Sequence, residues 1–150
     1  MNSYLRHIAL VVPNLREAEE YYQSIFQMEL VGREAELDDG QWYTLPAGKS
    51  WEEAEAAGIE LDMLALRKGD IVLAFFPGPH PSGQVFAIGL ALPQAQVAEV
   101  KKRLPPDTEI LLDESEQFNF RDRYGIMWQL VPPGDEFQMN GDSTGRWLAL

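Results

Sequence analysis

The first hydrophobic stretch of the chain predicts a strand followed by a capped helix. Residues from His7 to Val12 are mainly aliphatic, and no breaker interrupts them before Pro13. Proline keeps the preceding residue out of the helical region, so the strand ends there. Asn14 then provides an N-cap, and Glu17 completes a capping box. Apolar side chains follow at helical spacing, at Leu15, Ala18, Tyr21, Tyr22, Ile25 and Phe26. A second strand is predicted at 29–33.

The same order of signals recurs about 80 residues later. The apolar run from Phe86 to Leu92 stops at Pro93, and a helical pattern follows from Gln94 to Leu104. Placing Pro13 on Pro93 aligns the two units and pairs His7 with Ala87. The chain therefore contains an internal repeat of a strand–helix unit.

The closing strands of the two units also match, at a smaller offset. Ile71–Pro77 and Met127–Pro132 are apolar runs that end in proline, and aligning them pairs Ala74 with Gln129. The offset is 55 residues here, so the first unit carries about 25 additional residues. We divide the chain, as a single domain, into module one (about 1–79, with an acidic insertion at about 36–61), module two (about 80–134) and a C-terminal tail (135–150). Further strands are predicted at 42–45, 62–67, 109–113 and 118–121, and Ser50 caps a short helix in the insertion.

Strand alternation predicts two faces of different character. Ile8, Leu10 and Val12 share one face of the first strand, and we expect this large aliphatic set to pack under the helices. The matching strand of module two repeats the pattern. The opposite face carries small residues, namely Ala9, Ala87, Gly89 and Ala91. Side chains of this size leave room for a ligand on a concave sheet.

Two tandem units of this kind resemble the vicinal oxygen chelate superfamily, which includes glyoxalase I, extradiol dioxygenases, fosfomycin-resistance enzymes and bleomycin-resistance proteins. The resemblance is carried by HIALVVPNLREAEEYY with FQMELVGRE, and by FRDRYGIMWQLVPP. In the last stretch Asp122, Gly125 and Leu130 match the superfamily's closing pattern, and Gln129 stands where glutamate is usual. The resemblance implies an α+β fold in which two tandem βαβββ modules form an open, cleft-containing mixed β-barrel. It also places the ligand site on the concave face.

The resemblance further implies where a metal would bind. Superfamily members hold divalent metals with ligands from the first and last strands of the modules, commonly two histidines and a glutamate. The matching positions are His7, Ala74, Ala87 and Gln129. A catalytic divalent metal normally takes three protein ligands, and only His7 is an unaltered one. We therefore expect no metal, and we expect His7 to lie on the cavity wall, hydrogen-bonded to Gln129.

Composition excludes several classes of function. The 150-residue chain is 45% hydrophobic and has no cysteine, so it can bury a core but offers neither disulfides nor thiolate chemistry. No apolar run approaches the ~20 residues of a membrane span, and the N-terminus lacks a signal-peptide pattern. The net charge of −12 disfavours nucleic acid. We expect a cytoplasmic protein without nucleic-acid or membrane partners.

The negative charge is concentrated in module one. Residues 34–62 contain nine acidic residues and a single basic one, Lys49. Trp42, Tyr43 and Trp51 lie among them, and aromatic faces beside carboxylates suit a cationic or aromatic guest. Alternatively, Trp51 belongs to the buried stripe of a short helix and the acids only face solvent. The insertion as a whole is a candidate lid over the cleft.

A second charged feature lies in the turn before the last strand. Arg121 and Arg123, beside Tyr124, are candidates for holding an anionic substrate, although their place in a turn favours a solvated hairpin tip.

These patterns favour a binding protein over an enzyme. We expect a small organic ligand, cationic or aromatic, bound in the cleft without a catalytic metal or another cofactor. The expected contacts are His7, Ala9, Trp42, Trp51, Ala74, Ala87, Gly89 and Gln129. One alternative is a metal-dependent lyase, isomerase or dioxygenase of the glyoxalase type, with His7 and Gln129 among its metal ligands. Another is a dimeric structural or regulatory module. We also expect a homodimer, because the apolar end of the tail, 147–150, suits a neighbouring chain or this chain's own sheet edge.

Overall fold

The computed structural model describes residues 3–78, 84–121, 125–134 and 137–150. Module one contributes β1 (Tyr4–Val12), α1 (Leu15–Phe26), β2 (Glu29–Glu36), β4 (Met63–Lys68) and β5 (Ile71–Pro77), and its insertion adds β3 (Trp42–Thr44) and α2 (Trp51–Ala56). Module two contributes β6 (Val85–Ala91), α3 (Gln94–Arg103), β7 (Glu109–Asp113), β8 (Phe118–Arg121) and β9 (Met127–Val131). A short helix that the sequence did not predict, α4 (Asn140–Thr144), follows in the tail. Asp122, Arg123 and Tyr124 lie outside the described residues.

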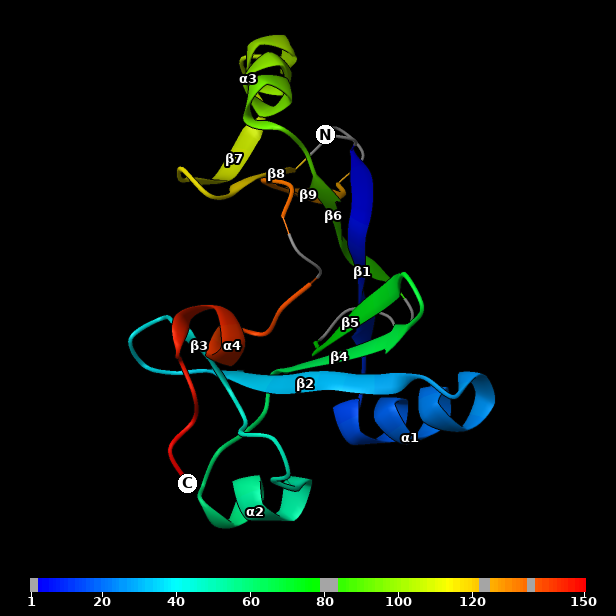
Figure 1. Ribbon diagram of the computed structural model, residues 1–150. Helices are drawn as coiled ribbons and strands as arrows, with labels where there is room; N and C mark the ends of the chain where they lie inside the picture. The colour runs from blue at the N-terminus through cyan, green and yellow to red at the C-terminus, as the bar shows by residue number, and fades with distance from the viewer. Residues whose placement is uncertain (1–2, 79–83, 122–124, 135–136) are drawn as a thin grey trace.

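All the strands of the described residues belong to one mixed sheet, in the order β3-β2-β4-β5-β1-β6-β9-β8-β7. β1 and β6 pair antiparallel at its centre and join the modules. Figure 1 shows the sheet strongly bent about this pair, with β2, β4 and β5 on one side and β7, β8 and β9 on the other. The predicted α+β class with two tandem modules is confirmed, and the sheet stays open because β3 and β7 form its two ends.

Strand register confirms the internal repeat residue by residue. In module one β1 and β5 run parallel and pair Ala9 with Ala74. In module two β6 and β9 also run parallel and pair Gly89 with Gln129. These two pairs are related by the offsets of 80 and 55 residues that the prolines predicted. The additional residues of module one form β3 and α2.

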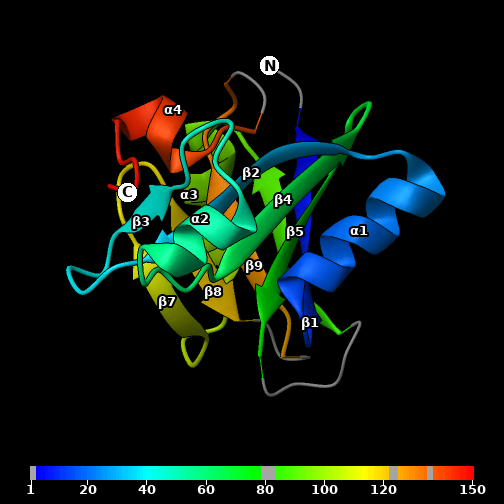
Figure 2. The same cartoon turned by 90° about the horizontal axis from the view of Figure 1, so that it is seen from below.

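Helices α1, α2 and α3 cover one face of the sheet, and the other face lies on the inside of the bend (Figure 1). Figures 1 and 2 show α1 and α2 together on the outer side of module one, and Figure 1 shows α3 on the outer side of module two. The predicted aliphatic face lies beneath them. The core under α1 contains Val12, Leu15, Ala18, Met28, Leu64, Leu66 and Phe75, and that under α3 contains Leu92, Val97, Phe118, Phe120 and Leu130. We call the opposite side of the sheet the inner face.

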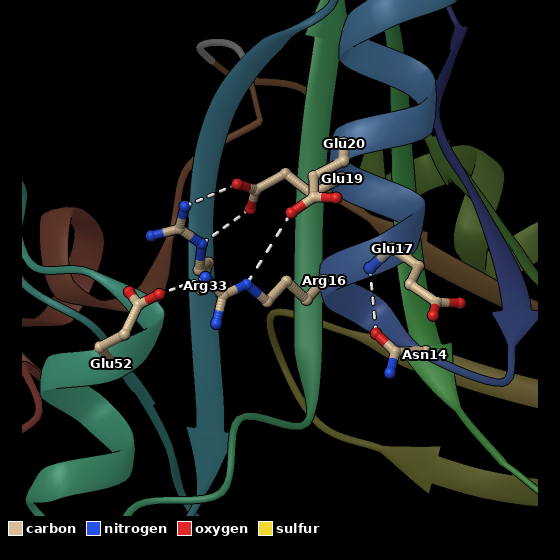
Figure 3. Close-up of polar contacts among 7 residues, drawn as sticks. All are labelled: Asn14, Arg16, Glu17, Glu19, Glu20, Arg33 and Glu52. Carbon is tan, nitrogen blue, oxygen red and sulfur yellow. Dashed lines mark hydrogen bonds and ion pairs between the residues drawn. The ribbon is translucent and has the colours of Figure 1, made fainter.

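Polar contacts fix α1 and α2 on the outer side (Figure 3). The Asn14 side chain accepts a hydrogen bond from the backbone N–H of Glu17, as the capping box predicted. Arg33 of β2 donates two hydrogen bonds to the Glu19 carboxylate of α1, each 2.7 Å long, and both side chains are nearly buried. Arg16 of α1 also pairs with Glu52 of α2. In the described part of the chain, no helix is long and apolar enough to cross a membrane.

Candidate functional site

The four positions that correspond to metal ligands in the superfamily lie together on the inner face. His7 of β1 pairs with Gly89 of β6, and Gly89 pairs with Gln129 of β9. The missing side chain of Gly89 opens the space between the two polar residues, so that His7 Nε2 lies 3.0 Å from Gln129 Oε1. A Cβ atom at Gly89 would lie 2.4 Å from His7 Cε1. The expected hydrogen bond between His7 and Gln129 is thus confirmed, and it depends on this glycine.

A β-bulge brings a charged group to the same place. Leu5 pairs with Leu90 and His7 pairs with Gly89, which leaves Arg6 as an additional residue of β1. Neighbouring residues of a regular strand point to opposite faces, whereas a bulge redirects a side chain. Arg6 Nη1 therefore reaches within 3.3 Å of His7 Nδ1.

This contact determines which ring nitrogen of His7 carries the proton. A guanidinium only donates hydrogen bonds, so His7 Nδ1 accepts from Arg6 and the proton lies on Nε2, which donates to Gln129. The ring is buried, with 6% of the residue exposed. Burial, reinforced by the charge of Arg6, lowers the pKa of His7 from 6.5 to about 4, although the hydrogen bond to Gln129 acts in the opposite direction. His7 is therefore a neutral imidazole at pH 7.

The first residues of the C-terminal segment (137–150), Phe137 and Met139, pack on the inner face beside His7 and β4, whereas Leu148 near its end joins the outer core. The Phe137 ring meets the His7 ring edge-on at a centroid distance of 5.3 Å, and Arg6 Cζ lies 4.6 Å from the centre of the Phe137 ring. Arg67 of β4 donates a hydrogen bond to the Phe137 carbonyl. Met139 is 2% exposed and packs against Met63 and Ala65 of β4. Part of the inner face is thus covered by the chain itself.

A buried carboxylate anchors this segment. Glu34 of β2 is 2% exposed and accepts hydrogen bonds from Thr44 Oγ1 and from the backbone and side-chain nitrogens of Asn140. Thr44 Oγ1 accepts a hydrogen bond from Gly141 N. These contacts place α4 against β3 on the side of the sheet opposite α2 (Figure 1).

A pocket of about 370 Å³ opens beside the Arg6–His7 pair. The first residues of β1, the β4–β5 turn and Phe137 form its walls. Its lining residues are Tyr4, Leu5, Arg6, Arg67, Gly69, Asp70, Val72 and Phe137. Its volume falls within the range of small-molecule sites. A second pocket, of about 300 Å³, lies on the outer side between α1 and α2 and includes Trp51 and Ile59.

Two of the four small residues predicted to line the cleft, Ala9 and Ala87, cluster with Ala74, and other side chains cover them. Ala9, Ala74 and Ala87 form one cluster on the inner face, and each is at most 2% exposed. Phe76 and Met127 pack against this cluster. The volume that the small residues leave is therefore taken up, at least over these three alanines, by protein side chains.

The two predicted tryptophans lie on opposite sides of the sheet. Trp42 contacts Phe76 edge-on and joins the inner-face cluster around Met139. Trp51 packs among the outer core residues and lies under the Arg33 guanidinium, with its centroid 5.0 Å from Arg33 Cζ. The structure thus brings together His7, Gly89 and Gln129 and leaves Trp51 apart from them.

Helix α2 of the insertion does not cover the inner face. It lies on the outer side, where Ala54 packs with Ala35, Leu45, Leu61 and Leu148. Two acids of the insertion make contacts within module one: Asp39 accepts a hydrogen bond from Tyr43, and Glu52 pairs with Arg16. Asp62, which directly follows the insertion, accepts a hydrogen bond from the Glu36 backbone. For α2 the expectation of a lid was wrong, because this helix packs on the outer core, whereas Trp42 of the same insertion reaches the inner face.

The residues at the inner face do not fit the superfamily's divalent metal. His7 and Gln129 satisfy each other, and the two remaining positions are alanines. No group of three or more His, Cys, Asp or Glu side chains suitable for a metal occurs among the described residues.

Sequence reasoning missed three residues beside the inner face, namely Arg6, Glu34 and Phe137. Alternation along the strand puts Arg6 on the outer face, and only the cross-strand pairing of β1 reveals the bulge. Glu34 looked like one of many surface acids. The apolar pair Phe137 and Met139, two residues apart in a polar tail, was the one available signal.

Comparisons with known proteins give likenesses in structure alone. No protein-family model and no curated protein sequence matches this chain. Among solved structures, the chain is similar to the hypothetical protein BH1468 from Bacillus halodurans C-125, with 12% identity, a TM-score of 0.59 and coverage of 93% of this chain and 100% of that one.

Two enzymes show the same likeness over part of their length. A mutant of 4-hydroxymandelate synthase from Streptomyces coelicolor matches 97% of this chain with 14% identity and a TM-score of 0.60. The 2,3-dioxygenase LapB from Pseudomonas sp. KL28 matches 91% of it with 14% identity and a TM-score of 0.56. The match spans 44% of each of those chains, less than half of their length. At such identities the likeness establishes the fold.

Proposed function

We propose that this chain, which has the fold of the vicinal oxygen chelate superfamily, binds a small organic molecule on the inner side of its sheet without a catalytic metal. The observation that carries the proposal is the hydrogen bond between His7 and Gln129, at 3.0 Å. The two polar residues at the superfamily's ligand positions use their nitrogen and oxygen atoms on each other. A metal-dependent enzyme of the glyoxalase type would need a third donor, and Ala74 and Ala87 have none.

The pocket beside Arg6 supplies the space that the proposal requires. It combines aromatic and aliphatic walls, from Tyr4, Val72 and Phe137, with a few charged groups. This combination is typical of small-molecule sites, in which apolar surface provides most of the affinity and a few polar groups fix orientation.

The preference for a cationic ligand loses its support. It rested on the acidic insertion, whose carboxylates Asp39, Glu52 and Asp62 bond to neighbouring parts of module one. Arg6 contacts His7, and Arg67 lines the same pocket as Arg6.

The test measures metal content and ligand binding on the same wild-type preparation. Elemental analysis after dialysis should give far less than one Zn, Ni, Mn or Fe per chain. A thermal-shift screen of small aromatic and aliphatic compounds should give hits that raise Tm saturably, because a ligand that binds the folded state stabilises it by mass action. EDTA should leave their affinities unchanged. One tightly held metal per chain, or hits that disappear with EDTA, would overturn the metal-free assignment.

A pair of matched substitutions localises the binding. Val72→Phe adds a ring to the pocket beside Arg6, whereas Ile59→Phe makes a comparable enlargement in the outer pocket between α1 and α2. Hits of the screen should be lost in the first variant and kept in the second. The reverse pattern would place the ligand on the outer side and refute the proposal.

A further inference from the structure

The charge of Arg6 has no carboxylate partner among the residues that the structure describes. Arg16, Arg33 and Arg121 each pair with a glutamate, at Glu52, Glu19 and Glu109 respectively. Arg6 contacts the neutral His7 ring and the face of Phe137 instead. The chain as a whole has many acidic residues, which outnumber its basic ones two to one.

The arginine is also partly buried. The bulge turns Arg6 toward the inner face, and burial lowers the pKa of its guanidinium. A guanidinium keeps its proton at any physiological pH, so the cost of desolvating the charge must be offset by a partner. Phe137 offsets part of it, since a cation over an aromatic face gains about 0.5–2 kcal/mol.

The pocket wall indicates which kind of partner is missing. Its lining contains two guanidinium groups, on Arg6 and Arg67, and one carboxylate, on Asp70. Arg6, whose charge has no carboxylate partner among the described residues, is therefore part of this lining. Tyr4 and Val72 add aromatic and aliphatic surface.

We propose that Arg6, redirected by the β1 bulge, binds the carboxylate of an organic monoanion whose apolar body fills the pocket between Tyr4, Val72 and Phe137. This inference rests on the proposed function and names its ligand class. The planar fork of arginine matches a carboxylate with two parallel hydrogen bonds. Contact with His7 Nδ1 and stacking on Phe137 hold the guanidinium in place before the ligand arrives, which reduces the entropy lost on binding.

Three probes of equal shape and different charge test the inference on the wild-type protein. Benzoate, benzamide and benzamidinium carry the same ring, and isothermal titration calorimetry measures each at low salt. Benzoate should bind at least tenfold more tightly than benzamide, and benzamidinium should bind most weakly. If benzamide or benzamidinium binds as well as benzoate, the inference is wrong while the proposed function stands. If none of the three binds, the inference is wrong, and the metal and screening experiments decide the proposed function by themselves.

Variants assign the effect to the residue. Arg6→Gln should weaken benzoate roughly ten- to hundredfold, the range expected for losing charge-assisted hydrogen bonds. Arg121→Gln is the control, because Arg121 is exposed and already paired with Glu109. Loss of benzoate in the Arg121 variant, or its retention in a folded Arg6 variant, would overturn the assignment.

A structural readout keeps the test decisive if Arg6→Gln does not fold. Crystals of wild-type protein soaked with 4-bromobenzoate locate the ligand through the anomalous signal of bromine. The carboxylate should lie within hydrogen-bonding distance of the Arg6 guanidinium and the bromine toward Val72. Bromine at any other place on the molecule, or at none, would refute the inference.

Discussion

Acidification should destabilise this protein through His7 in a measurable way. Burial and the charge of Arg6 hold the pKa of His7 at about 4, against 6.5 for an unperturbed side chain. The unfolded chain therefore takes up a proton near pH 6.5, whereas the folded protein takes it up only near pH 4. Between pH 6.5 and pH 4 the unfolded state binds more protons than the folded state, so the free energy of unfolding falls with the pH. The contribution of neutral His7 to this free energy is complete above about pH 6.5 and is lost as the pH falls toward 4.

The expected loss of unfolding free energy follows from the difference between the pKa values of His7 in the unfolded and folded states. Each pH unit over which only the unfolded chain is protonated is worth about 1.4 kcal/mol, so a change from pH 7 to pH 5 should cost about 2 kcal/mol of unfolding free energy. The chain's carboxylates titrate as well, and a comparison with a His7→Gln variant cancels their contribution.

The assay is urea unfolding of wild type and His7→Gln at pH 7 and pH 5. Between the two pH values wild type should lose about 2 kcal/mol more than the variant. His80 is the only other histidine of the chain, and His80→Gln shows whether replacing any imidazole changes the result. Equal losses in wild type and His7→Gln would mean that His7 titrates normally, and the account of its burial beside Arg6 would be wrong.

Three further substitutions test the packing of the inner face by the same unfolding measurement. Gly89→Ala places a Cβ atom 2.4 Å from the His7 ring and should cost about 1–3 kcal/mol, an effect that should shrink when His7 is already alanine. Glu34→Gln replaces one carboxylate oxygen by an N–H₂ group, which then faces at least one of the three donors around Glu34, and should also cost about 1–3 kcal/mol, whereas Glu36→Gln on the surface should cost little. Ala87→Leu should cost about 1–3 kcal/mol, because Phe76 and Met127 already fill the space above it; unchanged stability would show that a free cleft exists there.

Much of the fold could be predicted because the relevant signals are local or repeated. Proline at the ends of β1, β5 and β6 aligned the two modules, and the register pairs Ala9–Ala74 and Gly89–Gln129 confirm that alignment. The residues on each face of β1 could be predicted because side chains alternate between the two faces of a strand. The resemblance to the vicinal oxygen chelate superfamily is confirmed at the level of the fold by structures with 12–14% identity.

The parts that could not be predicted depend on contacts between distant segments. The bulge at Arg6 exists only in the pairing of β1 with β6. Helix α4 is five residues long and contains Asn, Gly, Asp, Ser and Thr, which have little helix propensity. It forms because Glu34 and Thr44 bond to its first residues. The sequence analysis expected the end of the tail on a neighbouring chain or on this chain's own sheet edge. It could not place Phe137 beside His7, because that contact also joins distant segments.

The C-terminal segment also determines how the sheet can meet another chain. Thr44 of β3, at one end of the sheet, pairs in parallel with Trp147 and exchanges backbone hydrogen bonds with Arg146 and Leu148. β7, at the other end, pairs within the described residues with β8 alone and exposes Ile110 and Leu111. An edge strand with unpaired backbone groups is a template for strand addition. If two copies paired through β7, the open β7 edge of each copy would be used in the contact. No open β7 edge would then be left for a third copy, so this association would stop at a symmetric pair and would not extend into a fibre.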